Sequence, residues 1–435
     1  MRTHAEPAPR TGAARHSAIA GFRAAAITLV PVIAVLVALG ALSLSPPAAH
    51  AATITVDVSG SGDHTTIQAG LTAAANGDTV LVLAGMYAGA GNRDLDFGTK
   101  SLTLISQQGS FWTIIDNQGE PGHRLFDFNG TGQDTTCLIS GFAIRGGRVE
   151  SGNGAGIRCV ASGPKFAYCR FEDNVVTDGD GGAIAAVSGS NVVIRYSTLA
   201  ENEADRGGAL YSSGNSSPLV GMCELKDNIA SLEGGALYVA PGNGDPRVTR
   251  CLFRDNDSGV NGGAITTDRA TLTATGCTLL RNTAGEGGGA LHATDTANAY
   301  FTNCTFVGNE APLQGGCVRV SAGTYFCILT KCIFAFTGPC AQRTIYADGR
   351  SAATLIQCCS YANAPGNDLP GGSSAYIVDD PLFCDVTSDD LTLASNSPCL
   401  PGGNGWAQQM GAHGQGCVES TVEVRSWGSI KAMYR

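Results

Sequence analysis

The chain has 435 residues, which is long enough for two or three ordinary domains or for one repetitive domain. Gly accounts for 59 residues without a collagen period, and a hydrophobic share of 43% with only 15% charged residues excludes a disordered chain. The formal net charge of −10 counts against nucleic acid and anionic lipid as partners.

Residues 1–51 have the pattern of a secretory signal peptide. Four Arg precede an apolar run over residues 24–44, and the sequence Ala-His-Ala ending at Ala51 supplies the small residues of a cleavage site. The run is also long enough for a retained membrane anchor, but three Pro in or just after it favour cleavage. We therefore expect a protein that is secreted or held at the cell surface or outer envelope, with no membrane span after cleavage. Losing four Arg and one Glu would change the net charge from −10 to −13.

The segment 52–90 is predicted to cap the fold and to form its first strand. Within it, "HTTIQAGLTAAANGDTVLVLAGMY" (residues 64–87) is rich in helix formers up to Asn76-Gly77, which ends the helix, and a strand follows. A short helix here would cover the open end of an apolar core, which a repetitive fold needs in order to stay soluble.

Residues 91–375 are predicted to form stacked coils, which are less regular at first and regular from about 150 to 340. The stretch "FEDNVVTDGDGGAIAA" (residues 171–186) recurs with variations every 26 to 28 residues. Its Asn recurs as Asn174, Asn202, Asn228, Asn256, Asn282 and Asn309. Its paired glycines recur as Gly181-Gly182, Gly207-Gly208, Gly234-Gly235, Gly262-Gly263, Gly288-Gly289 and Gly315-Gly316. Six copies in register predict a repeat architecture.

Each repeat is too short to be a domain and lacks helical periodicity. It offers two or three short runs of Ile, Val, Leu, Thr and Tyr, separated by Gly, Asn and Asp. Three short strands per repeat make one coil of a parallel β-helix, with successive coils about 4.8 Å apart. We therefore predict an all-β, single-stranded parallel β-helix in which the Asn side chains form a hydrogen-bonded ladder and Gly-Gly forms a turn.

Two further columns of residues are predicted to face the core. The apolar column is Phe171, Leu199, Leu225, Phe253, Leu279 and Phe306. Two residues earlier, on the same side of the strand, lie Cys169, Ser197, Cys223, Cys251, Cys277 and Cys304. Stacked Cys side chains point in parallel, so we expect a mostly reduced ladder rather than disulfides or a metal–thiolate row. Disulfides are expected instead among the irregular C-terminal set Cys340, Cys358, Cys359, Cys384, Cys399 and Cys417.

Residues 376–417 are predicted to be a Cys-rich closing segment that includes "IVDDPLFCD" and "LTLASNSPCLPGG". Asp379-Asp380 stands before Pro-Leu-Phe, which favours a structural turn over a catalytic pair of carboxylates. The tail, residues 418–435, has a different composition and is interpreted either as a short sorting tag or as a plain flexible end.

The helix followed by the "GDTV" strand, together with the Phe-x-x-Asn and Gly-Gly-Ala-Ile/Leu coils, resembles the pectate-lyase-like right-handed parallel β-helix superfamily over residues 53–400. The coils are similar to those of polymorphic outer-membrane-protein type adhesins, which use the same two signatures. The resemblance implies a right-handed β-helix. It implies no particular chemistry, because the complete ordered set of Asn-x-Asp, Asp-Asp, Gly-His-Gly and Arg-x-Lys that the hydrolase branch carries is absent from this sequence.

The first binding hypothesis is a column of outward-facing residues. After Gly-Gly-Ala, the Ile or Leu should point inward and the next residue outward. The outward column is then Arg158, Ala185, Tyr211, Tyr238, Thr266, His292 and Arg319. Tyr211 and Tyr238 would stack as a platform for a sugar ring, and Arg158 and Arg319 would bind carboxylates or sulfates. The alternative is that Tyr and Thr here are ordinary strand residues.

The second hypothesis is a column of acidic residues. The residue before the ladder Asn is Asp173, Glu201, Asp227 or Asp255 in four successive coils. Like charges about 5 Å apart repel one another, so these carboxylates either extend into water or are bridged by Ca²⁺. We expect that no cofactor is required, with Ca²⁺ as the one candidate ion.

These features predict an exported, non-catalytic β-helix protein that binds glycans or other surface partners in the manner of an adhesin. The alternative is a polysaccharide lyase or epimerase acting on uronic-acid polymers, which Arg or Lys clustered beside two or three outward Asp on one coil face would indicate. A second alternative is a structural envelope component, which self-assembly would reveal. The sequence leaves the oligomeric state open.

Overall fold

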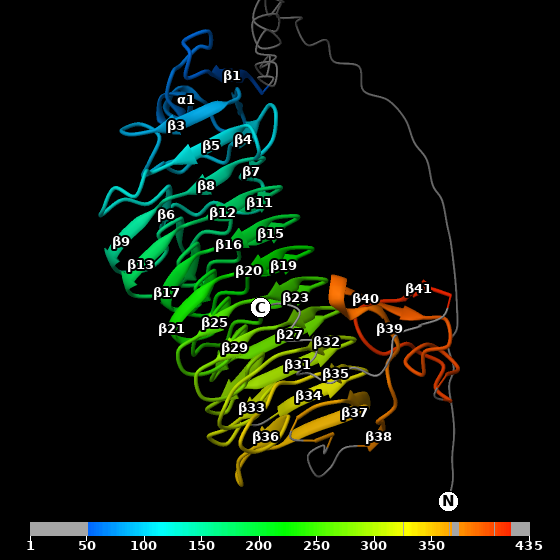
Figure 1. Cartoon of the computed structure of the whole chain (residues 1–435). Helices are drawn as coiled ribbons and strands as arrows, with labels where there is room; N and C mark the ends of the chain where they lie inside the picture. The colour runs from blue at the N-terminus through cyan, green and yellow to red at the C-terminus, as the bar shows by residue number, and fades with distance from the viewer. Residues whose placement is uncertain (1–50, 325, 365, 368–373, 404, 419–435) are drawn as a thin grey trace, which may run out of the picture. The chain divides into compact units, whose positions relative to one another are not determined.

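The computed structural model describes residues 51–418, except residues 325, 365, 368–373 and 404. The predicted signal peptide and nearly all of the predicted tail lie outside the described residues. The described chain winds into a parallel β-helix whose coils follow one another in sequence order (Figure 1). The predicted all-β parallel solenoid is therefore confirmed.

A regular coil consists of four short strands, and equivalent strands of successive coils pair in parallel. The first stack comprises β1 (Thr53–Val56), β2 (Thr79–Val82), β4 (Thr103–Ser106), β7 (Leu138–Ser140), β11 (Lys165–Ala167), β15 (Val193–Arg195), β19 (Leu219–Gly221), β23 (Arg247–Thr249), β27 (Thr271–Thr275), β31 (Asn298–Thr302), β34 (Phe326–Thr330), β37 (Ala353–Tyr361) and β38 (Ser374–Ile377). The second comprises β3 (Gly85–Ala88), β5 (Thr113–Asp116), β8 (Ala143–Arg145), β12 (Arg170–Glu172), β16 (Thr198–Ala200), β20 (Glu224–Lys226), β24 (Leu252–Arg254), β28 (Thr278–Leu280), β32 (Thr305–Val307) and β35 (Ile333–Ala335).

The other two stacks complete the coil. The third comprises β9 (Arg148–Ser151), β13 (Val175–Asp178), β17 (Glu203–Arg206), β21 (Ile229–Glu233), β25 (Asp257–Ser258) and β29 (Thr283–Ala284). The fourth comprises β6 (Phe126–Asn129), β10 (Ile157–Val160), β14 (Ile184–Val187), β18 (Leu210–Ser212), β22 (Leu237–Val239), β26 (Ile265–Asp268), β30 (Leu291–Thr294), β33 (Val318–Val320) and β36 (Ile345–Ala347). The expectation of three strands per coil is wrong by one, because the strands of the first and second stacks are separated by only a two-residue corner such as Tyr168-Cys169.

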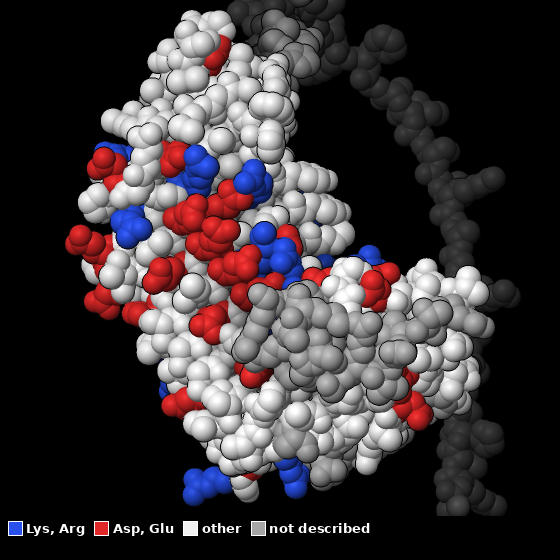
Figure 2. All heavy atoms as spheres, in the orientation of Figure 1, with Lys and Arg blue, Asp and Glu red and all other residues white. Residues whose placement is uncertain are grey.

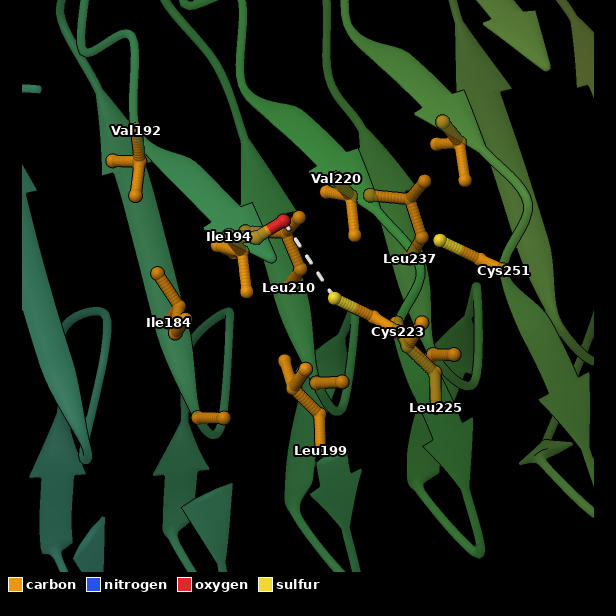
Figure 3. Close-up of a cluster of buried hydrophobic side chains, with 14 of the residues drawn as sticks. Ile184, Val192, Ile194, Leu199, Leu210, Val220, Cys223, Leu225, Leu237 and Cys251 are labelled. Atoms are coloured by element: carbon orange, nitrogen blue, oxygen red, sulfur yellow. Dashed lines mark hydrogen bonds between the residues drawn. The ribbon is translucent and has the colours of Figure 1, made fainter. Parts of the chain in front are cut away.

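The interior of the coils is a continuous apolar core. The predicted apolar column is in register from coil to coil, and Phe171, Leu199 and Leu225 are fully or almost fully buried. The predicted Cys column is buried as well and its members are free thiols. Figure 3 shows Cys223 and Cys251 among aliphatic side chains, with the Cys223 Sγ 3.6 Å from the carbonyl oxygen of Ile194. Sulfur here fills the space of a small apolar group.

The six predicted Asn side chains form a hydrogen-bonded ladder along the axis, and all are fully buried. Asn202 shows the pattern: its Nδ2 donates to the Oδ1 of Asn228 at 2.9 Å and to the carbonyl oxygen of Phe171 at 3.0 Å. Its backbone N–H donates to the same Oδ1 at 3.2 Å. Each such side chain therefore satisfies backbone groups of the preceding coil and bonds the Asn side chain of the following coil, at the corner where no strand pairing reaches them.

The two ends of the described chain differ from its middle. The predicted helix is present as α1 (Ile67–Ala73), and Gly70 lets it approach Val56 and Val80, the inward side chains of the first two strands. The Lys100 Nζ donates to the carbonyl oxygen of Ala74 at its C-terminus, at 3.0 Å. Within the described residues, α1 is far too short to cross a bilayer, and no other helix is long and apolar enough to do so.

The closing segment folds back along the side of the coils. It contains β39 (Phe383–Asp385), the 3₁₀ turn η1 (Val386–Ser388), β40 (Asp390–Ala394) and β41 (Gln415–Cys417), and a disulfide joins Cys384 to Cys417. Its apolar side chains pack on the outer faces of β28, β32 and β35. Figure 1 shows β39, β40 and β41 beside these coils. The disulfide lies within the predicted C-terminal set. Cys358 of that set belongs instead to the core ladder, because β37 continues the stack and Cys332 donates its N–H to the Cys358 sulfur at 3.4 Å.

Candidate functional site

The predicted outward column is aligned as expected on the fourth stack. Pairing in register places Arg158, Ala185, Tyr211, Tyr238, Thr266, His292 and Arg319 one above another. The rings of Tyr211 and Tyr238 are stacked, with centroids 5.9 Å apart and planes 12° apart. Strand alternation thus gave the direction of these side chains correctly.

The column is not the open platform that the sequence suggested. Tyr238 is only 5% exposed and His292 only 4%, because the turns that precede Gly-Gly fold over them. The guanidinium of Arg206 lies 5.6 Å from the centroid of the Tyr238 ring, and the Tyr238 hydroxyl donates to Asp268 at 3.1 Å. A sugar ring has no access to that ring face.

Both predicted Arg side chains are already engaged. Arg158 makes a bidentate contact with Asp127, with distances of 2.9 and 2.6 Å. Arg319 donates to the Oδ1 of Asn261 at 2.5 Å and lies 3.8 Å from Glu286. Arg158 therefore pairs with a neighbouring strand of the same stack, whereas Arg319 fastens the turns at Asn261 and Glu286 onto the stack.

His292 belongs to an arrangement with the order of a Ser–His–acid triad. Its Nε2 lies 2.9 Å from the Ser321 Oγ, and its Nδ1 lies 3.4 Å from a carboxylate oxygen of Glu233. A hydrolase of this type also needs free donors for an oxyanion. The N–H groups of Ser321, Ala322 and Gly323 are all used, by Ala293, Asp348 and Ser351 respectively. We therefore treat the arrangement as structural.

The predicted acidic column lies at the corner that the Asn ladder stabilises. Asp173, Glu201, Asp227 and Asp255 all have φ between 55° and 57°, in the left-handed region. Glu201 is exposed, and Asp227 lies 3.8 Å from the Nζ of Lys226. Over the described part of the chain, no group of three His, Cys, Asp or Glu is arranged to hold a metal ion.

Arg and carboxylate side chains do cluster on the face of the second stack. Figure 2 shows acidic side chains gathered with basic ones over the coils around β12, β16 and β20. Arg254 contacts Glu224 at 2.7 Å and Asp255 at 3.1 Å, and Arg281 bridges Asp255, at 2.8 Å, to Asp389 of the closing segment. The carboxylates that a catalytic cation would need are thus already ion-paired with Arg side chains. The same ion pairs connect the closing segment to the coils.

The corner between the first and second stacks carries exposed aromatic rings that the sequence analysis missed. Tyr168 and Tyr196 are 59% and 45% exposed, and their rings stack with centroids 5.1 Å apart and planes 7° apart. Extending the β5–β8 register by two residues sets Trp112 opposite Gly141, two coils before Tyr168. Trp112 ends a longer corner, residues 107–112, and Ser106 and Gly109 are the groups nearest to Gly141. Trp112 is 58% exposed and packs against the exposed Phe111, with ring centroids 4.9 Å apart.

We call Phe111, Trp112, Tyr168 and Tyr196 the aromatic corner. Tyr168 and Tyr196 have φ of 55° and 51°, and this left-handed corner conformation turns their side chains out of the strand and away from neighbouring turns. The residue before the core Cys is the sequence signal, since aligning the repeats one position earlier reveals the column. Alternation along a strand could not reveal it, because these residues lie between strands.

The same column runs on into a pocket between the coils and the closing segment. The next residues of the column are Met222, Arg250, Gly276 and Asn303, and all four line this pocket of about 650 Å³. Gln409 and His413 of the closing segment line its opposite wall. The His413 Nε2 lies 2.7 Å from the Thr278 Oγ1, and burial lowers the pKa of this imidazole below its ordinary value, so it is neutral.

Comparisons with known proteins agree with the architecture. A family model described as a right-handed beta helix region matches residues 127–311. The sequence has no match among curated proteins. Among solved structures, a pectin methylesterase from carrot is similar at 13% identity with a TM-score of 0.28, over 75% of this chain and 88% of that chain. The matched region, and the coils that continue on both sides of it, show that the chain is a right-handed parallel β-helix repeat protein.

Proposed function

We propose that the protein is an exported, non-catalytic β-helix protein that binds a glycan along the aromatic corner. The observation that carries the proposal is the stacked and exposed pair Tyr168–Tyr196, in register with Trp112. Two rings that expose about half of their surface on a rigid frame lose little conformational entropy on binding, and aromatic faces are suited to pack against the C–H faces of sugar rings. Export, to the medium or the cell surface, rests on the pattern of residues 1–51.

The geometry of the corner suits a linear polymer. Successive coils rise by about 4.8 Å, so the corner offers a row of four regularly spaced positions. These are occupied in turn by Trp112, Gly141 (which leaves a gap), Tyr168 and Tyr196. Exposed aromatic side chains in such a row are unusual on a monomeric surface and are typical of interaction sites. A row along the axis favours a chain of sugars over a compact ligand.

The rival functions find less support. A lyase or epimerase needs carboxylates and a base that are free to act, whereas Glu224, Asp255 and Asp389 are each paired with Arg. A structural envelope component would expose surfaces for self-association, which light scattering of the mature protein would reveal.

The test uses residues 52–435 and tetrasaccharides of β-linked glucose, mannose and galactose, with binding measured by calorimetry and products by absorbance. Tyr196→Ala is expected to weaken binding about tenfold, because it removes one ring of the stacked pair. Phe326→Ala, which removes an equally exposed ring from β34 away from the corner, is the control and should bind as the wild type does. Unchanged binding by Tyr196→Ala, or release of unsaturated products, would contradict the proposal.

A further inference from the structure

The aromatic corner has one open end and one closed end. Beyond Tyr196 the column continues through Met222 and Arg250 into the pocket. The closing segment then crosses the corner: the Gly411 N–H donates to the carbonyl oxygen of Lys331 at 2.7 Å, and the Lys331 Nζ contacts Gln408. The Ala412 N–H donates to the Thr305 Oγ1 at 2.9 Å. A polymer lying on the aromatic corner can therefore extend past Trp112 but meets a wall at Lys331.

The pocket at the closed end holds a cation with no partner in the described part of the chain. Arg250 is exposed and makes no ion pair with any described residue. Its side chain extends along the corner toward Gly276: a Cβ placed on Gly276 would lie 3.5 Å from the Arg250 Cγ. Asp389, the carboxylate that lines the same pocket, is bound by Arg281. A free guanidinium is therefore available in a protein whose net charge is strongly negative.

A second polar group in the pocket also lacks a partner. The Asn303 Oδ1 is buried and accepts no hydrogen bond within the described structure. A buried acceptor without a donor costs free energy unless a ligand or water satisfies it. A sugar hydroxyl is a donor of the right kind, whereas an anion is not, so Arg250 and Asn303 together suit a unit that carries both hydroxyl and anionic groups.

We infer that this pocket binds the terminal unit of a glycan chain and selects a unit bearing a carboxylate or a sulfate. The inference rests on the proposed function, since the chain reaches the pocket along the aromatic corner. Arg250 binds the anionic group, and the Asn303 side chain rotates so that its buried Oδ1 becomes accessible and accepts from a hydroxyl. The wall at Lys331 makes the site specific for a chain end. The protein would thus bind one end of each chain and leave the interior of the polymer free.

The charge test compares the same three tetrasaccharides in four forms: neutral, with a terminal uronate, with a terminal sulfate, and with an internal uronate. The wild type is expected to bind at least one terminally anionic form about tenfold more tightly than its neutral counterpart, and Arg250→Gln should remove this preference. The uronate and sulfate arms distinguish the two sources of charge. Arg350→Gln, which removes an exposed Arg outside the corner, should leave the preference unchanged.

The outcomes separate the two proposals. If Tyr196→Ala weakens binding but Arg250→Gln leaves the anion preference intact, or if the internal uronate is preferred as strongly as the terminal one, the pocket inference is overturned and the aromatic corner stands. If Tyr196→Ala has no effect, or if no probe binds, both proposals are overturned. A stoichiometry that stays at one protein per chain for longer polymers would support recognition of the end, and a stoichiometry that grows with length would contradict it.

Discussion

At the scale of single residues, the Asn ladder holds the corner between the second and third strands of each coil. The ladder side chains between the two ends use their Nδ2 and their Oδ1 at least twice each, as Asn202 and Asn228 show, so neither polar atom of these amides is left without a partner. Buried amides are stabilising only when they are satisfied in this way. Loss of one rung therefore leaves two backbone groups of the preceding coil without this partner and interrupts the side-chain ladder to the following coil.

Asn228→Ala is expected to lower the free energy of unfolding by about 2–4 kcal/mol, because the Leu199 carbonyl oxygen and the Asn202 backbone N–H lose their side-chain partner and the Asn202 Nδ2 loses one of its acceptors. Urea denaturation followed by circular dichroism measures the effect. Asn243→Ala, at an exposed turn, should change stability by less than about 0.5 kcal/mol. Equal losses in the two variants would show that the ladder is not a special source of stability.

Residue patterns predicted the inward columns correctly, but they did not reveal why acidic residues recur beside the ladder Asn. Inward columns were predictable because stacking places equivalent residues in equivalent surroundings. Asp173 and Asp227 were predicted either to extend into water or to be bridged by Ca²⁺; the structure adds that the backbone there is left-handed, a conformation that Asp tolerates better than most residues. Gly308 occupies the equivalent corner of a later coil with φ of 63°, as this conformational requirement predicts.

At the scale of elements, the outer face of the second stack changes character where the closing segment covers it. The outward residues of β20 are Glu224 and Lys226, whereas those of β32 and β35 include Val307, Ile333 and Ala335, all buried under the segment. This change from polar to apolar is the sequence signal for a lateral cover. The docking position of residues 376–417 was not predictable from the sequence, because this segment has no repeat from which a position could be inferred.

The docking of the closing segment is expected to weaken in mild acid. Burial lowers the pKa of His413 in the folded protein below its ordinary value of 6.5, so the unfolded chain binds the proton more readily than the folded one. The stabilising contribution is complete above pH 6.5 and is lost as the pH falls through the lower folded-state pKa. Calorimetry between pH 7 and pH 5 should show a falling Tm for the wild type.

His413→Gln is the matched control for this pH dependence, since an amide can still hydrogen-bond to the Thr278 Oγ1 but does not titrate. Its Tm should fall less than that of the wild type over the same interval, even if it starts lower at pH 7. Parallel curves for the two proteins would show that other groups cause the acid sensitivity.

At the scale of the whole molecule, repetition made the fold predictable and left the candidate site hidden. Stacking, the inward columns and the N-terminal helix follow from local periodicity and turn chemistry. The exposure of an outward residue depends on whether a neighbouring side chain or turn covers it. The sequence therefore predicted Tyr211 and Tyr238 as an open platform, although Arg206 covers Tyr238. The pocket at Arg250 requires a contact between residues more than 130 positions apart, such as Thr278 and His413, which no local pattern encodes.

The redox state of the whole chain provides the last prediction. Of the 16 Cys, 14 are free in the structure and only Cys340 among them is not buried. Burial raises the pKa of Cys169 to about 11 and that of Cys327 to about 12, so these thiols stay protonated and unreactive while the coils are stacked. Native protein should therefore label at one thiol at pH 8, unfolded protein at 14, and reduced and unfolded protein at 16.

This titration separates the two ways in which an exported, Cys-rich protein can be stabilised. Disulfides between coils would lower the count in the unfolded protein below 14, in steps of two. A reduced ladder gives the full count, and slow labelling of the native protein then occurs only when the coils open, so its rate reports the unfolding of the core. Cys340→Ser should abolish the fast phase in native protein and leave the slow phase unchanged. Loss of the slow phase instead would show that the ladder is accessible without unfolding.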